Sequence, residues 1–145
     1  MSYDPRTVGA SGRPAAPGPK ETAGRRESPI LVVEDDTSIL DLVLQILRAE
    51  GYPAVGAKNG VEGLVEVDRI APSLILLDMR MPRMDGWEFA AALRKRGIAS
   101  PVVVMTAAEN AKRWADEVGA QGYVEKPFEF GELLDSVARH RRPTN

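Results

Sequence analysis

Short aliphatic runs alternate along the chain with longer stretches in which hydrophobic residues recur every three or four positions. The runs at 30–33, 74–77 and 102–105 contain no polar residue. Such unbroken runs predict strands that are buried on both faces, as in a parallel sheet. Residues 52–57 are a weaker strand candidate, and residues 122–125 form a further short strand. The pattern therefore predicts five strands.

Five stretches that follow these runs place hydrophobic residues at the spacing of an amphipathic helix. Asp36 or Thr37 can cap the first helix, and Gly51 ends it. The pair Asn59-Gly60 predicts a turn before the second helix. The expected inward positions are Ile39, Leu40, Leu42, Val43, Ile46 and Leu47 in the first helix, Val61, Leu64 and Val65 in the second, Phe89 and Leu93 in the third, Ala111, Trp114, Ala115 and Val118 in the fourth, and Phe130, Leu133, Leu134, Val137 and Ala138 in the fifth.

Strict alternation of strand and helix indicates the fold class. Parallel strands joined by such short segments need helical crossovers, which gives a doubly wound α/β sandwich. Five strands fit a five-stranded parallel sheet in the order 2-1-3-4-5, the flavodoxin-like (βα)5 arrangement, whose switch point lies between strands 1 and 3. We therefore expect strand 30–33 to lie beside strand 74–77.

The distribution of proline and glycine divides the chain. Residues 1–28 contain four prolines and four glycines and almost nothing that can pack, which is typical of a disordered leader. We expect one ordered domain over residues 29–142 and a short tail over 143–145. Because the chain stops soon after the last predicted helix, we expect it to act without an output domain of its own.

Composition and charge exclude several classes of function. The chain is 43% hydrophobic and 28% charged with a net charge of −2, which favours neither nucleic-acid nor membrane-surface binding. It has no cysteine and a single histidine, His140, so thiol chemistry and cysteine or histidine metal clusters are excluded. No apolar run is long enough to span a membrane, and residues 1–28 lack a signal-peptide core. We expect a cytoplasmic protein that contacts neither membrane nor nucleic acid directly.

Polar side chains stand where the predicted strands end. Glu34 and Asp35 follow the first strand, Asp78 follows the third, Thr106 the fourth and Lys126 the fifth. The carboxyl ends of parallel strands share one edge of the sheet, and strands 1 and 3 are neighbours there. Carboxylates a few ångströms apart repel by up to roughly 4 kcal/mol at an effective dielectric constant of 20, so the acidic residues predict a divalent-cation site. Oxygen ligands favour Mg²⁺.

Asp78 is the candidate nucleophile of this edge. A lysine and a hydroxyl facing the same place, Lys126 and Thr106, supply a point charge and a hydrogen bond for a phosphoryl group. An aspartate, a divalent ion, a lysine and a threonine together predict covalent capture of a phosphoryl group on Asp78.

The motifs that carry these residues resemble the receiver domain of bacterial response regulators. They are VEDD at 33–36, LDMRMPRMDG at 77–86, MTA at 105–107 and KPF at 126–128, and the resemblance covers about residues 28–141. It implies that Asp78 accepts a phosphoryl group from a phosphohistidine. It also implies that Asp35, Asp78 and the backbone carbonyl of Arg80 bind Mg²⁺ directly with Glu34 acting through water, that Thr106 and Lys126 bind phosphoryl oxygens, and that Lys126-Pro127 is a cis peptide.

The resemblance further implies a regulatory phosphoacceptor rather than an enzyme. Phosphorylation would draw Thr106 and Lys126 inward, and Tyr123 would repack into the vacated space, although a static, half-buried Tyr123 is an open alternative. The surface formed by the last two predicted helices and the strand between them would then change. A sensor histidine kinase or a histidine phosphotransfer protein is the implied donor, and an unidentified downstream protein would read the surface. Arg80, two residues after Asp78, is expected to slow the loss of phosphate.

Two other classes of function remain open. A Mg²⁺-dependent aspartyl-phosphate phosphohydrolase would also use a strand-terminal aspartate, but such enzymes usually place a general acid two residues later, where this chain has Arg80. A toprim-like nuclease or primase would need a carboxylate at the same position. The second class is a protein-binding module that acts without phosphorylation, and the complete acceptor set argues against it.

Overall fold

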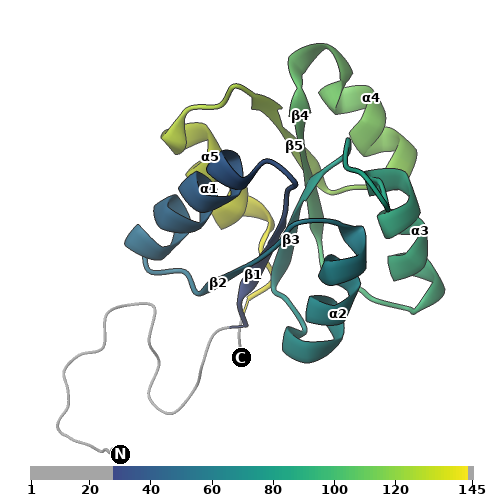
Figure 1. Cartoon of the computed structure of the whole chain (residues 1–145). Coiled ribbons are helices and arrows are strands. Elements are labelled where there is room, and N and C mark those ends of the chain that lie inside the picture. The colour runs from purple at the N-terminus through teal and green to yellow at the C-terminus, as the bar shows by residue number, and fades with distance from the viewer. Residues whose placement is uncertain (1–27, 144–145) are drawn as a thin grey trace, which may run out of the picture.

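The structure, a computed structural model, describes residues 28–143, and these form ten elements in strict strand–helix alternation (Figure 1). The predicted leader, apart from Ser28, and the last two residues of the predicted tail lie outside the described residues. The strands are β1 (Ile30–Val33), β2 (Ala54–Ala57), β3 (Leu74–Asp78), β4 (Val102–Ala107) and β5 (Gly122–Lys126), and the helices are α1 (Thr37–Ala49), α2 (Gly60–Ile70), α3 (Gly86–Lys95), α4 (Ala108–Val118) and α5 (Phe130–His140).

The strands form one parallel sheet in the order β2-β1-β3-β4-β5, which confirms the predicted topology. Helices α1 and α5 cover one face of the sheet, and α2, α3 and α4 cover the other (Figure 1). Val33 of β1 pairs with Leu77 of β3, and Asp78 pairs with Met105 of β4. The residues that follow β1 and end β3 therefore meet at one edge of the sheet.

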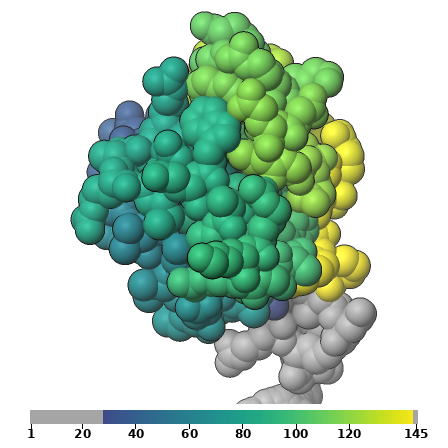
Figure 2. All heavy atoms as spheres, turned by 90° about the vertical axis from the view of Figure 1, so that its right-hand side faces the viewer, coloured from purple at the N-terminus to yellow at the C-terminus, as the bar shows by residue number. Residues whose placement is uncertain are grey.

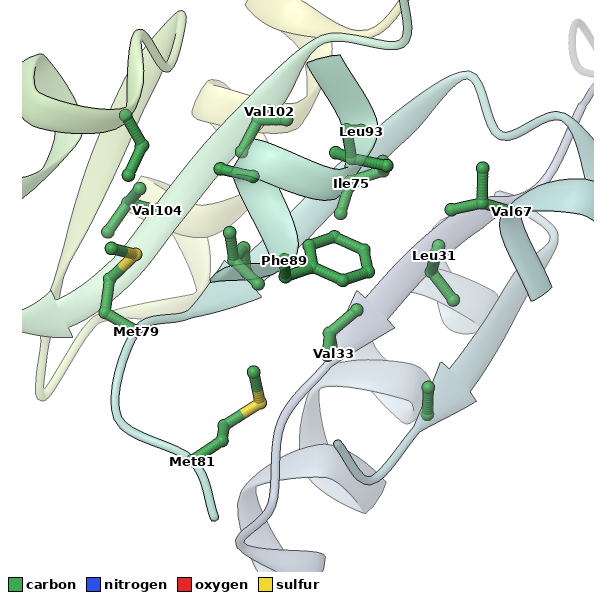
Figure 3. Packing of buried hydrophobic residues seen from close by; sticks show 14 of the residues in the cluster. Leu31, Val33, Val67, Ile75, Met79, Met81, Phe89, Leu93, Val102 and Val104 are labelled. Carbon is green, nitrogen blue, oxygen red and sulfur yellow. The ribbon is translucent and has the colours of Figure 1, made fainter. Parts of the chain in front are cut away.

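Alternate residues of the central strands point to the two faces, as strand geometry requires. Leu31 and Val33 of β1 and Ile75 of β3 contribute to the core under α2, α3 and α4. Figure 3 shows the ring of Phe89, from α3, lying among these side chains. Gly63 of α2 permits this packing, because a methyl group there would lie 2.8 Å from Phe89 Cε1. The expectation of fully buried central strands is confirmed.

Three helices expose some of the residues that we expected to face the core. In α1, Leu42 is 39% exposed, whereas the expected inward positions Leu40, Val43, Ile46 and Leu47 are buried. Val61 and Val65 of α2 and Phe130 and Ala138 of α5 are also exposed, although we expected them to face the core. Within residues 28–143, no helix combines the length and the apolar character that crossing a bilayer requires.

Side-chain caps fix the start of the helices near the functional edge. Asp36 Oδ1 accepts a hydrogen bond from Ile39 N at 3.1 Å, as predicted for the start of α1. Asn59 caps α2 in the same way, so within the predicted turn pair Asn59 is the N-cap and Gly60 is the first residue of the helix. Asp85 forms a capping box with Glu88 at the start of α3.

Gly86, the first residue of α3, lies directly against the loop that follows β3. A methyl group at this position would lie 2.5 Å from Met79 Sδ and 2.7 Å from Met79 Cα. Because the Cα atom belongs to the backbone and cannot move aside cheaply, we expect Gly86→Ala to lower the free energy of unfolding by roughly 1–3 kcal/mol. Urea denaturation measures the loss.

Gly131, in α5, provides the matched control. A methyl group there meets no atom within 4 Å, and helix propensity favours alanine. We expect Gly131→Ala to leave stability unchanged or raise it by up to about 1 kcal/mol. Equal effects of the two substitutions would contradict the close packing at Gly86.

Candidate functional site

Three carboxylates meet where β1 and β3 end. Glu34 and Asp35 follow β1, Asp78 ends β3, and one carboxylate oxygen from each lies within 4.8 Å of the others. Glu34 is 1% exposed and Asp78 is 5% exposed, whereas Asp35 faces solvent. The pairing of β1 with β3 causes this convergence, which the strand order predicted.

Lys126, at the end of β5, reaches across the sheet edge to this cluster. Its Nζ lies 2.7 Å from Glu34 Oε1 and 3.6 Å from Asp78 Oδ1. The following peptide bond, Lys126-Pro127, is cis, as the resemblance implied. Sequence reasoning placed Lys126 at the site but did not identify Glu34 as its closest ionic partner.

The pKa of Asp78 is raised from 3.8 to about 8. Burial is the main cause, because it penalises the charged carboxylate, and the neighbouring charge of Glu34 adds to the effect. The Lys126 ammonium opposes the rise only in part. In the absence of a cation, burial and Glu34 therefore favour the protonated form of Asp78, and a protonated carboxyl is a poor nucleophile.

The carboxylate cluster fits a hard divalent cation. It offers oxygen ligands from two buried and one exposed side chain, at the mutual spacing that a single ion can bridge. Arg80 adds a backbone connection, since its N–H lies 3.4 Å from Asp78 Oδ1. The donor set matches Mg²⁺, with Asp35, Asp78 and the Arg80 carbonyl as candidate direct ligands and Glu34 as a candidate ligand through water.

Thr106 lies on β4, the neighbour of β3, and Tyr123 lies on β5, the next strand in the sheet. Thr106 is buried in β4, one residue beyond Met105, the strand partner of Asp78, so it stands at the same sheet edge. Tyr123 of β5 is 40% exposed and pairs with Val104, further from that edge. The structure thus brings Thr106 to the rim with Asp78 and Lys126, and it places the ring of Tyr123 partly in solvent.

Two buried methionines anchor the loop after Asp78 to the hydrophobic core. Met79 and Met81 bury their side chains in the core, and Figure 3 shows both thioethers at the end of the hydrophobic cluster. Arg80, between them, is exposed, and its Cζ lies 5.2 Å from the centre of the Trp114 ring in α4. A shallow cavity of about 300 Å³ adjoins this loop and is lined by Met79, Arg80, Met81, Pro82, Asp85 and Trp87.

Sequence reasoning missed both the cavity and the contact between Arg80 and Trp114. The helical spacing of Trp114 indicated only that it packs inward. No local pattern connects it to a loop on another strand, because the contact depends on how α4 is rotated over the sheet.

Comparison with known proteins identifies the class to which this arrangement belongs. Residues 30–138 match the family described as the response regulator receiver domain. The chain belongs to this family, which confirms the resemblance seen in the sequence.

Individual relatives agree with the family assignment. The chain is 39% identical over 110 residues to the transcriptional regulatory protein PcoR of Escherichia coli, covering 74% of this chain and 49% of PcoR. It is 38% identical over 117 residues to the response regulator MprA of Mycobacterium leprae, covering 79% of this chain and 51% of MprA. The chain thus spans about half the length of the curated relatives it matches.

Solved structures confirm the fold. The chemotaxis protein CheY4 of Vibrio cholerae superposes with a TM-score of 0.72 at 30% identity, covering 79% of this chain and 98% of CheY4. The receiver domain of NtrX from Brucella abortus has a TM-score of 0.72 at 32% identity, covering 77% of this chain and 96% of that domain. The flavodoxin-like prediction is therefore correct.

The names of the relatives bear on one further expectation. PcoR is named as a transcriptional regulatory protein, and so is YkoG of Bacillus subtilis, which is 39% identical over 110 residues. These names run against our expectation that the protein makes no direct contact with nucleic acid. This chain matches about half the length of each of these two proteins.

Proposed function

We propose that this protein is the phosphoacceptor of a two-component signalling pathway and that Asp78 is the residue phosphorylated. A carboxylate oxygen of Asp78 attacks the phosphorus of a phosphohistidine on a sensor histidine kinase or a histidine phosphotransfer protein. The oxygen–phosphorus bond forms as the nitrogen–phosphorus bond breaks, and the imidazole leaves. The product is an acyl phosphate, so the protein acts as a regulator and not as an enzyme that releases product.

The convergence of Glu34, Asp35, Asp78 and Lys126 at one sheet edge supports this proposal most strongly. Mg²⁺ bound there would supply positive charge that favours the ionised form of Asp78 and offsets the charge of the transferred group. Lys126 stands 3.6 Å from the attacking carboxylate and can bind a phosphoryl oxygen in place of Glu34. The Thr106 hydroxyl would donate a hydrogen bond to a second phosphoryl oxygen.

The consequence of phosphorylation would be read on the surface of α4, β5 and α5. Movement of Thr106 toward the phosphoryl group would leave space that the half-exposed ring of Tyr123 can enter. We propose an ordered receiver unit over residues 29–142, a cytoplasmic location and a downstream protein as the reader of this surface. The names of PcoR and YkoG favour control of transcription as the eventual output.

Phosphorylation by a small donor tests the function. Incubation with Mg²⁺ and acetyl phosphate is expected to give an acid-stable, base-labile adduct at about one equivalent per protein, and Asp78→Asn is expected to abolish it. Asp36→Asn is the matched control, because Asp36 caps α1 and asparagine caps equally well. Release of many equivalents of phosphate would instead support the phosphohydrolase, and the absence of labelling would support a phosphorylation-independent binding module.

A further inference from the structure

Arg80 connects the loop after the phosphoacceptor to helix α4. Its backbone N–H donates a hydrogen bond of 3.4 Å to Asp78 Oδ1, so the backbone of Arg80 contacts the reactive carboxyl. Its guanidinium lies over Trp114, with 5.2 Å between Cζ and the ring centre. Buried Met79 and Met81 on either side hold the Arg80 side chain on the outer face of the loop.

The surface on which Arg80 rests is held firmly in place. Trp114 is 6% exposed and meets Trp87 of α3 edge to face, with ring centres 4.9 Å apart. Trp87 Nε1 in turn donates a hydrogen bond of 2.8 Å to Glu117 Oε1 of α4. Figure 2 views the molecule from the side on which α3 and α4 pack together. The two tryptophans therefore connect α3 to α4. Arg80 contacts Trp114 through its guanidinium and Asp78 through its backbone N–H.

In the unphosphorylated site, the Asp78 carboxyl is poorly placed to bind the Arg80 guanidinium. The carboxyl is buried, and Oδ1 already faces Lys126 Nζ at 3.6 Å and Arg80 N at 3.4 Å. A phosphoryl group on Asp78 would add oxygens beyond the buried carboxyl and up to two negative charges. Guanidinium binds phosphate through paired charge-assisted hydrogen bonds, which are stronger than cation–π contact at an exposed position.

We propose that Arg80 leaves the face of Trp114 for the phosphoryl group when Asp78 is phosphorylated. This exchange links the chemical state of Asp78 to α4 by a route separate from Thr106 and Tyr123. The guanidinium would then lie over the acyl phosphate and hinder attack by water, in line with the slow loss of phosphate already expected from the resemblance. The inference rests on the proposed function of Asp78, and it goes further by assigning Trp114 as the residue that holds Arg80 in the resting state.

Tryptophan fluorescence tests the exchange, since Trp87 and Trp114 are the two tryptophans of the sequence. In a Trp87→Phe background, Trp114 provides all the indole emission while an aromatic ring remains beside it. Acetyl phosphate and Mg²⁺ are expected to shift this emission in the protein that carries Arg80 and to leave it unchanged after Arg80→Ala. Mass spectrometry of the same samples gives the phosphorylated fraction, so that emission is compared per phosphorylated molecule.

The decay of the acyl phosphate provides a second readout. Removal of acetyl phosphate by gel filtration should be followed by a loss of phosphate that is about 2- to 5-fold faster in Arg80→Ala, because the variant lacks the guanidinium that would bind the phosphoryl oxygens. Arg83→Ala removes the same charge from the same exposed loop and should decay like the parent.

The outcomes separate the two proposals. The absence of an adduct in every variant would overturn the proposed function and this inference together. A normal adduct accompanied by the same emission shift in Arg80→Ala, or by equal decay in Arg80→Ala and the parent, would overturn the inference and leave the proposed function intact.

Discussion

Asp78→Asn is expected to stabilise the metal-free protein by several kcal/mol at pH 8 and by much less at pH 5. The pKa of Asp78 is raised from 3.8 to about 8 by burial and by the charge of Glu34. Folding thus favours the protonated carboxyl. The contribution of Asp78 to the free energy of unfolding is therefore highest below pH 3.8, where Asp78 is protonated in both the folded and the unfolded state. It falls as the pH rises and Asp78 ionises, until the pH has passed 8. Asparagine cannot ionise, so the variant does not suffer this loss.

The gain from Asp78→Asn should therefore be roughly 2–4 kcal/mol larger at pH 8 than at pH 5. Urea denaturation at both pH values, in the presence of a chelator, measures the difference. Asp41→Asn, at an exposed position of α1, is the matched control and should show no such dependence on pH. Saturating Mg²⁺ should raise the stability of the parent at pH 8 and narrow the gap, because the ion binds ionised Asp78. A gain independent of pH would contradict the buried, protonated carboxyl.

Lys126→Met is expected to destabilise the metal-free protein by roughly 3–5 kcal/mol at neutral pH. Glu34 is 1% exposed, and Lys126 Nζ, at 2.7 Å, is its ionic partner among the described contacts. Methionine keeps the length of the side chain and removes the charge, which leaves a buried carboxylate without compensation. Urea denaturation with a chelator present measures the loss.

An exposed lysine provides the control for this prediction. Lys112 forms an ion pair of 3.1 Å with Asp116, but both side chains are largely in solvent. Lys112→Met should therefore cost no more than about 1 kcal/mol. Adding Glu34→Gln to Lys126→Met should recover part of the lost stability, since it removes the uncompensated charge. Equal losses for the two lysine variants would show that Lys126 acts as an ordinary surface residue.

The sheet could be predicted from the sequence because its central strands are unbroken aliphatic runs, which few other structures accommodate. The exposure of Leu42 could not be predicted. Helical spacing admits Leu42 to the same hydrophobic stripe as Leu40 and Val43, but the structure buries those two residues and leaves Leu42 39% exposed. A methyl group at Gly56 of β2 would lie 3.0 Å from Leu40 Cδ1, so Gly56 permits the close approach of Leu40 to the sheet. This contact depends on a strand that no local pattern in α1 describes.

The acidic cluster was predictable for a topological reason, since residues that end neighbouring parallel strands must share an edge. The ionic pairing within the site was not. Lys126 could have approached either acidic residue, and its Nζ lies 2.7 Å from Glu34 Oε1 and 3.6 Å from Asp78 Oδ1, a difference that no local pattern encodes. The position of Arg80 over Trp114 depends likewise on packing between α3 and α4, which no local pattern encodes.

Chemical mapping of the modified residue tests the central claim most directly. After incubation with acetyl phosphate and Mg²⁺, borohydride reduces an aspartyl phosphate to homoserine, and peptide mass spectrometry then locates the reduced residue. We predict homoserine at position 78 and unchanged aspartate at positions 35 and 36. Reduction at another aspartate, or at none while the protein is folded and Mg²⁺ is bound, would contradict the assignment of Asp78 as the phosphoacceptor.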